Sequence, residues 1–220
     1  MAAAAAATML LARADSAIMR TKRDATNVSI AEIDAPTTTY PHRDHPIALR
    51  EPIAKAVDEY VLQNWDFEGD EACRRRFLSS GVGSLAFEYF PSALEERIGL
   101  VARHLAVVFL ISDSLSEYEA EDGEEYVEAL EAAAKGYWMP DEEVPAVWML
   151  CSLFDEMRTI DYVLVDDVME TTLGHLRACL FRRGRTTNRG DGRRSPGFRI
   201  GAALVSSLSS FATGMEADGW

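Results

Sequence analysis

The sequence predicts an all-α fold, an antiparallel bundle of helices. From His45 onward, apolar residues recur at the three- and four-residue spacing of amphipathic helices. No stretch alternates between apolar and polar residues as a half-buried strand does. Glycine and proline divide the helical pattern into consecutive segments, notably at Gly81, Pro91 and Pro140. Consecutive helices joined by short breaks pack most simply as an antiparallel bundle.

The composition is that of a globular protein with a strong negative charge. The chain has 220 residues, of which 48% are hydrophobic, and its formal net charge is −14. That length is enough for one substantial domain. No uninterrupted apolar stretch reaches the roughly 18–20 residues of a membrane span, so we expect a soluble, cytoplasmic protein. The negative charge argues against a nucleic-acid partner, since phosphate neutralisation needs a basic surface.

The N-terminal part differs from the rest of the chain. Residues 1–44 lack sustained periodicity, and we expect a disordered or poorly packed leader before a helical domain over residues 45–220. The leader makes a weak signal peptide, because no charge precedes its apolar stretch, and a mitochondrial presequence is the alternative. The cysteines are widely spaced and odd in number, which indicates reduced thiols rather than disulfides or a zinc site.

Apolar periodicity and breaks place the helices of the first half. Ser92, followed by Glu95, is typical of a capping box, and it predicts the start of a long helix. Four helices are expected in this half, over about residues 47–64, 70–80, 84–90 and 93–118, and the last of them is the long helix.

The second half begins with an acidic segment and ends with a basic one. Residues 124–135 are predicted to form an exposed helix or an ordered lip, because acids dominate there. Amphipathic helices are expected over 144–160 and 161–180, and a last apolar helix over 200–215. Between them, residues 182–199 hold seven arginines among small and polar residues, a composition typical of a loop.

The most informative feature is an acidic pair at the end of the long apolar helix. Asp113 and Glu117 follow the run Val107–Ile111 and lie four residues apart, so a helix places both on one face. Carboxylate oxygens are what Mg²⁺ prefers, and this ion completes its shell with water and substrate phosphates. A solvated helix end with two exposed acids is the alternative.

Several short motifs occur around this pair in a specific order. They are His45-Pro46, Val57-Asp58-Glu59-Tyr60, Asn64-Trp65, Tyr89-Phe90-Pro91, Glu96-Arg97-Ile98, Val108-Phe109-Leu110-Ile111, Met139-Pro140-Asp141 and Phe154-Asp155-Glu156-Met157-Arg158. In this order the chain resembles the fungal sesquiterpene cyclases of the class I terpene synthase superfamily, of the aristolochene synthase type, over roughly residues 45–180. The resemblance implies the all-α class I terpenoid synthase bundle.

The resemblance also implies a substrate and a cofactor. Members of that family bind Mg²⁺ through a helix-borne acidic motif and ionise farnesyl diphosphate, a prenyl diphosphate, in secondary metabolism. Aligned at its outer acids, the motif reads Asp113-Ser-Leu-Ser-Glu117, with Ser114 where the family has a second acid. In a second register, Ser112 leads and Asp113 stands second, and we favour the first register because it retains Glu117 and Tyr118.

The resemblance assigns further residues to the substrate site. We expect Phe87 and Phe109 to line the pocket and Arg158 and Arg199 to contact substrate, with Arg194 as the alternative to Arg199. Each also has a plain structural explanation: the aromatics as core, Arg158 as an intrahelical partner of Asp155 or Asp161, and the arginine run as a solvated loop. His104 is expected to be a hydrogen-bonded core histidine rather than a general base.

Beyond residue 180 the sequence departs from the family pattern. The second metal motif, Asn-Asp-x-x-Ser-x-x-x-Glu, does not occur, and we expect a bundle that is incomplete at its C-terminus. A catalytically impaired relative that binds a terpenoid or a partner, and a truncated gene product, are therefore alternatives to an active cyclase. An incomplete bundle exposes apolar faces, which predicts a homodimer or aggregation.

Overall fold

The computed structural model describes residues 47–67, 69–116, 118–137, 139, 144–186 and 200–215. Every regular element in these ranges is an α-helix, which confirms the predicted all-α class. The helices are α2 (Ile47–Asn64), α3 (Glu71–Ser80), α4 (Val82–Tyr89), α5 (Glu95–Leu115), α6 (Ala120–Ala134), α7 (Pro145–Ile160), α8 (Tyr162–Thr186) and α9 (Ala202–Thr213).

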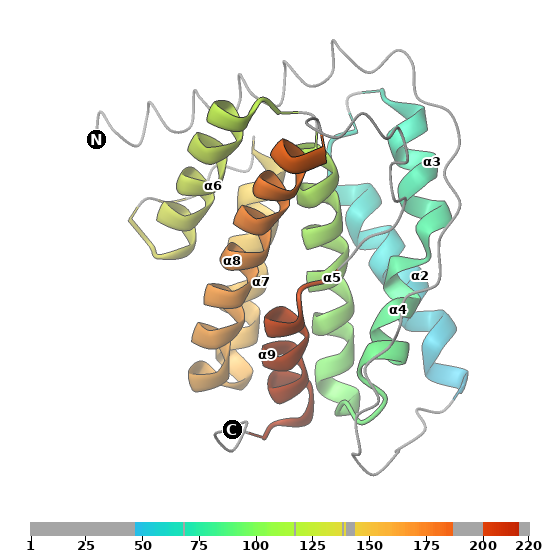
Figure 1. The fold of residues 1–220 in the computed structure, drawn as a ribbon. Coiled ribbons are helices and arrows are strands. Elements are labelled where there is room, and N and C mark those ends of the chain that lie inside the picture. The colour runs from blue at the N-terminus through green and yellow to red at the C-terminus, as the bar shows by residue number, and fades with distance from the viewer. Residues whose placement is uncertain are drawn as a thin grey trace.

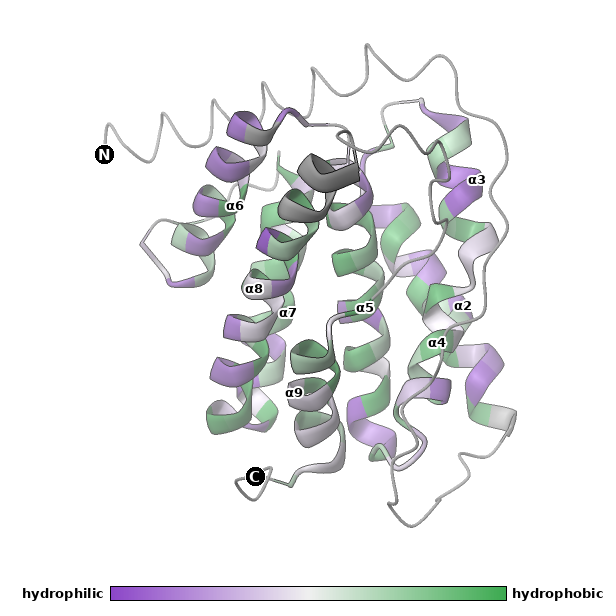
Figure 2. Ribbon diagram, viewed as in Figure 1, coloured by the Kyte–Doolittle hydropathy of each residue, from purple (hydrophilic) through white to green (hydrophobic). Residues whose placement is uncertain are grey.

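Helix α5 is the centre of the bundle. It packs against α2 and α4 on one side and against α7, α8 and α9 on the other (Figure 1). Twelve of its residues are buried, because the segment is apolar around most of its circumference. Figure 2 shows the same distribution, with apolar residues running along α4, α5 and α9. The position of Asp113 two residues before the end of α5 therefore places it where the core meets solvent.

Helix α5 also passes a length and hydropathy test for a membrane span. It is the one helix in the described ranges that does so, and 67% of its most apolar 18-residue window is buried inside the fold. The central helix of a bundle has the same composition as a spanning helix because both are surrounded by apolar groups.

Helix α6 differs from its prediction as an exposed helix or lip. Its acidic residues face outward, but Tyr126, Val127 and Leu130 are buried, and α6 packs against α7 and α8. The apolar residues recur at i, i+1 and i+4, which gives the helix a narrow buried face that the surrounding glutamates conceal in the sequence.

The start of α5 also differs from its prediction. The capping box at Ser92 is wrong, because Leu94 occupies the N-cap and no side-chain hydrogen bond caps the helix there. The Leu94 N–H donates instead to the carbonyl oxygen of Ala212 in α9, at 2.8 Å. The entry to α5 is thus fixed by a contact with the far end of the chain, and the helix spans Glu95–Leu115 rather than 93–118.

Two predicted segments fall wholly or partly outside the described residues. The predicted leader, residues 1–44, lies outside them. The predicted arginine-rich loop lies outside them from residue 187 to 199, and its first residues belong to α8, which continues through Thr186.

Candidate active site

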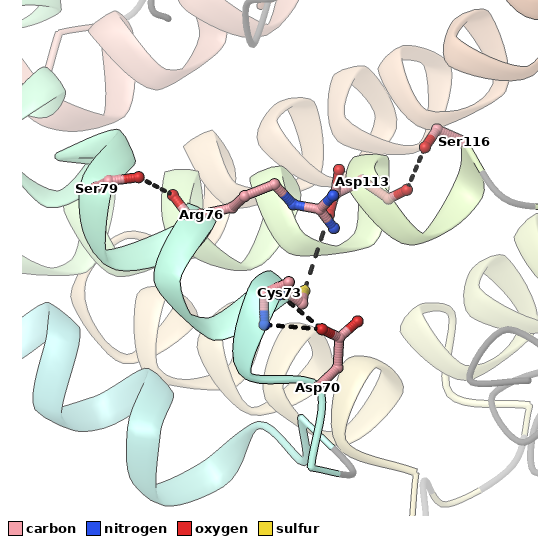
Figure 3. A network of polar contacts seen from close by, with 7 residues as sticks. Asp70, Cys73, Arg76, Ser79, Asp113 and Ser116 are labelled. Carbon is pink, nitrogen blue, oxygen red and sulfur yellow. Dashed lines mark hydrogen bonds and ion pairs between the residues drawn. The ribbon is translucent and has the colours of Figure 1, made fainter. Parts of the chain in front are cut away.

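Asp113 forms an ion pair with a residue that lies outside its sequence motif. The Nη2 of Arg76, on α3, donates to the Asp113 carboxylate at 3.2 Å, and the Cys73 thiol lies 3.9 Å from the same oxygen (Figure 3). The Asp113 side chain is 29% exposed, and that of Arg76 is 37% exposed. The carboxylate is therefore at the surface of the bundle, already next to a positive charge.

Local sequence explains why α3 presents Arg76 and Cys73 there. Asp70 is the N-cap of α3 and accepts hydrogen bonds from the N–H groups of Ala72 and Cys73, at 2.9 Å each. Cys73 and Arg76 lie three residues apart and hence on one helical face. That face is held against α5 by the rings of Phe77 and Phe109, whose centroids are 6.4 Å apart.

The surroundings of Arg76 shift the pKa of its guanidinium. Burial lowers the pKa of the Arg76 guanidinium, the Asp113 carboxylate raises it, and the net shift is upward. Arg76 is therefore a permanent cation at this end of α5. Its buried Nε has no hydrogen-bond partner among the described residues.

The side chains near Asp113 fit a magnesium site that is completed by water and substrate phosphates, and do not fit a site made of protein ligands alone. No three His, Cys, Asp or Glu side chains converge within the described ranges, so an all-protein cage is not formed by those residues. Mg²⁺ usually keeps several waters and is held by one or two carboxylates together with substrate phosphates. Asp113 can supply such a carboxylate. Glu117, its predicted companion, lies outside the described residues.

The structure separates the two predicted pocket aromatics. Phe109 is one turn before Asp113 and half-buried against Phe77, close to the candidate site. Phe87 is fully buried on α4, where the guanidinium of Arg50 lies 5.7 Å from its ring centroid. Arg50 is in the first turn of α2, which begins at the same end of the bundle as α5 (Figure 1). Phe87 therefore lies toward the opposite end of α5 from Asp113.

Of the predicted basic residues, Arg158 is the one that the structure describes, and it is paired within its own helix. Arg158 donates to Asp155 on the same helix at 2.8 Å, which is its plain structural explanation. Arg199 and Arg194 lie outside the described residues. The cation that does meet Asp113 is Arg76, which the sequence analysis missed. Its only signal was the one-turn spacing from Cys73, behind an Asp N-cap.

His104 is a core residue, as expected. It is fully buried, and its Nε2 lies 2.9 Å from the Thr172 hydroxyl on α8. Burial, with a smaller contribution from His175, lowers its pKa to about 3. A neutral, enclosed imidazole of this kind links α5 to α8.

Comparisons with known proteins show which proteins the chain is similar to. No family model matches the chain. It is 31% identical to aristolochene synthase from Aspergillus terreus over 196 residues, which are 89% of this chain and 60% of the relative. It is 34% identical to an aristolochene synthase from Penicillium rubens over 185 residues, which are 84% of this chain and 53% of the relative.

The solved structures agree with the sequence relatives. The crystal structure of aristolochene synthase from Penicillium roqueforti superimposes with a TM-score of 0.66 at 31% identity, covering 84% of this chain and 63% of that one. The chain thus spans between about half and just under two thirds of the length of the proteins it matches. In sequence and in structure, the chain is a homologue of the fungal aristolochene synthases and has the all-α fold of the class I terpene synthases.

Proposed function

We propose that the protein is a sesquiterpene cyclase that ionises and cyclises farnesyl diphosphate with Mg²⁺, in secondary metabolism. The observation that carries the proposal is the position of Asp113 at the end of the buried helix α5, in a fold homologous to aristolochene synthases. The substrate and the cofactor come from the family resemblance.

The chemistry of the site supports this assignment. Asp113, with Glu117, would hold Mg²⁺, and the bound ion would neutralise charge on a departing diphosphate. Arg76 brings a second positive group to the same place, and its partly exposed guanidinium is suited to an anionic oxygen. Phe109 lies on the apolar side of the carboxylate, where an aromatic face stabilises a carbocation.

The test is product formation by the purified chain. Protein incubated with farnesyl diphosphate and Mg²⁺ should release a volatile sesquiterpene, detected by gas chromatography and mass spectrometry. EDTA should abolish the product, and added Mg²⁺ should restore it. The Asp113→Asn variant removes the charged ligand and should lower the rate on the order of 100-fold or more.

Asp166→Asn is the matched control, because Asp166 is an exposed acid on α8. It should keep the wild-type rate within about twofold. Circular dichroism establishes that both variants fold. Equal product from wild type and Asp113→Asn, or product in EDTA, overturns the proposed site. Absence of product from a folded wild-type chain overturns the proposed activity of this chain.

The same proposal includes where the protein acts in the cell. Burial of α5 inside the bundle supports a cytoplasmic protein that acts outside the membrane. A homodimer stays a prediction, to be tested by sedimentation or light scattering.

A further inference from the structure

Asp113 has a cationic partner at the oxygen that faces α3. The Nη2 of Arg76 lies 3.2 Å from the Asp113 Oδ2, and the Cys73 thiol lies 3.9 Å from the same oxygen (Figure 3). Mg²⁺ bound to a carboxylate lies about 2.0–2.1 Å from its oxygen. A divalent ion that close and the guanidinium repel each other, since both are positive. The ion pair and a bound metal therefore compete for the Asp113 carboxylate.

The acids at the start of α3 are engaged elsewhere and do not replace Asp113. Asp70 caps the helix, and its Oδ1 accepts hydrogen bonds from two backbone N–H groups of the first turn at 2.9 Å each. Glu71 pairs with Arg74 at 3.6 Å. A guanidinium keeps its charge at neutral pH. When a metal takes Asp113, Arg76 is thus left as a cation that has lost its counterion.

The exposure of Arg76 allows it to meet a ligand instead. Its side chain is 37% exposed, and that of Asp113 is 29% exposed, so both groups reach solvent. The planar guanidinium presents paired N–H donors that match two oxygens of a phosphate. A diphosphate that accompanies the metal supplies such oxygens beside the released guanidinium. Without the metal, the same diphosphate meets the negative carboxylate of Asp113, which repels it.

We infer that Arg76 couples metal binding to diphosphate binding at this site: it competes with Mg²⁺ for Asp113, and it binds the diphosphate once the metal holds that carboxylate. The inference rests on the proposed function, which assigns Mg²⁺ to Asp113. Each ligand favours the position of Arg76 that the other requires, so the two affinities are linked reciprocally. The site therefore takes Mg²⁺ and diphosphate together and selects against either one alone.

Metal binding without diphosphate tests the competition. Mn²⁺ replaces Mg²⁺ as the probe, because electron paramagnetic resonance measures its free concentration. Arg76→Gln should bind Mn²⁺ about fivefold more tightly than the wild type, since an exposed ion pair is worth up to about fivefold in an equilibrium constant. Arg76→Lys keeps the charge and should stay within about twofold of the wild type. Equal or weaker Mn²⁺ binding by Arg76→Gln overturns the competition, because loss of a merely supporting residue does not tighten binding.

Binding of inorganic diphosphate tests the second role of Arg76. Equilibrium dialysis with radiolabelled diphosphate and saturating Mg²⁺ should show about tenfold weaker binding to Arg76→Gln, because a charged hydrogen-bond donor is lost. An unchanged affinity overturns this role.

Arg75→Gln is the matched control for both measurements. It removes the same charge from an exposed position one residue away on α3, and one residue along a helix faces a different direction. Both affinities should stay within about twofold of the wild type. Shifts as large as those of Arg76→Gln would come from net charge alone and would overturn the role of Arg76.

The two measurements also distinguish this inference from the proposed function. If the wild type binds neither Mn²⁺ nor diphosphate with Mg²⁺, the proposed metal site at Asp113 is wrong, and the inference is wrong with it. If the wild type binds both and Arg76→Gln behaves in the same way, the inference alone is overturned. Circular dichroism establishes that each variant folds. Should Arg76→Gln unfold, Arg76→Met, which keeps the aliphatic part of the side chain, is measured against the same expectations.

Discussion

At the scale of single residues, His104 gives the fold a dependence on pH. Its Nε2 is 2.9 Å from the Thr172 hydroxyl, which itself donates to the Val168 carbonyl oxygen at 2.6 Å. The hydroxyl proton is therefore committed, and the imidazole must donate from Nε2. The ring centroid also lies 5.5 Å from that of Phe154, so the neutral imidazole is enclosed by apolar atoms.

This burial predicts loss of stability in mild acid. The pKa of His104 is about 3 in the folded protein, against 6.5 for an exposed histidine. Between these values the unfolded chain binds a proton that the folded chain excludes, so the free energy of unfolding falls as the pH falls, by up to about 1.4 kcal/mol per unit. Urea denaturation at pH 6.5, 6.0 and 5.5 measures the slope, above the range in which most carboxylates titrate.

The matched variants separate titration from hydrogen bonding. His104→Gln should reduce that slope, because glutamine does not titrate. Thr172→Val should lower stability by about 1–3 kcal/mol at every pH and leave the slope, because the histidine remains. An unchanged slope in His104→Gln contradicts the assignment of the pH dependence to this residue.

The ion pair between Arg76 and Asp113 contributes little to the stability of the fold. Both of its members are about one third exposed, and such pairs are worth roughly 0.2–1 kcal/mol. Arg76→Gln should therefore lower the free energy of unfolding by less than about 1 kcal/mol in urea denaturation. Arg158→Gln, which breaks a pair with an Asp155 side chain that is 76% exposed, is the control and should cost no more. A loss of several kcal/mol in Arg76→Gln contradicts this view.

The contact of Arg76 with Asp113 could not be predicted from the sequence. The two residues are 37 positions apart, and their meeting depends on how α3 packs on α5. Sequence reasoning identified Asp113 because an apolar run followed by an acid is a local pattern. The carboxylate's cationic partner, like the separation of Phe87 from Phe109, is a property of tertiary packing, which no local pattern contains.

At the scale of helices, positions were predictable and boundaries less so. Helix α2 spans residues 47–64 as predicted, because its apolar periodicity is local information. The predicted start of α5 was wrong because the Leu94 N–H donates to the carbonyl oxygen of Ala212, a residue more than a hundred positions away. The predicted helices over 70–80 and 84–90 leave Gly81 and Gly83 together in the break between them. Only Gly81 breaks the helix, with a left-handed φ of 62°, while Gly83 lies inside α4.

Gly83 has a packing role that predicts the cost of a methyl group. A Cβ there would lie 3.2 Å from the Cα and 3.3 Å from the carbonyl oxygen of Ala54, on the backbone of α2. Backbone atoms cannot give way as a side-chain end can, so α2 and α4 must move apart. Gly83→Ala should lower the free energy of unfolding by about 1–3 kcal/mol, measured by urea denaturation.

Gly99→Ala is the control for this prediction. Gly99 is inside α5, and a Cβ there meets no atom within 4 Å. Alanine should therefore stabilise the protein by about 0.5–1 kcal/mol through helix propensity and a less flexible unfolded chain. If Gly83→Ala stabilises the protein as Gly99→Ala does, α2 and α4 do not depend on the close approach.

At the scale of the whole molecule, one hydrophobic core joins the described helices. Buried residues from α2 through α9 form a single cluster, with α5 at its centre. A shared core of this kind predicts one cooperative unfolding transition rather than separate loss of outer helices. Leu130 on α6 and Leu208 on α9 are both fully buried; α6 packs on α7 and α8, and α9 packs on α5 and α8.

Leucine-to-alanine substitutions test this cooperativity. Leu130→Ala and Leu208→Ala should each lower the free energy of unfolding by about 2–5 kcal/mol, because each leaves a cavity in the core. Leu78→Ala, at a side chain that is 39% exposed on α3, should cost less than about 1 kcal/mol. Circular dichroism and tryptophan fluorescence should give coincident urea transitions in all three variants. A separate early transition in Leu208→Ala would mean that α9 unfolds alone, and that the contact between Ala212 and Leu94 does not bind it into the core.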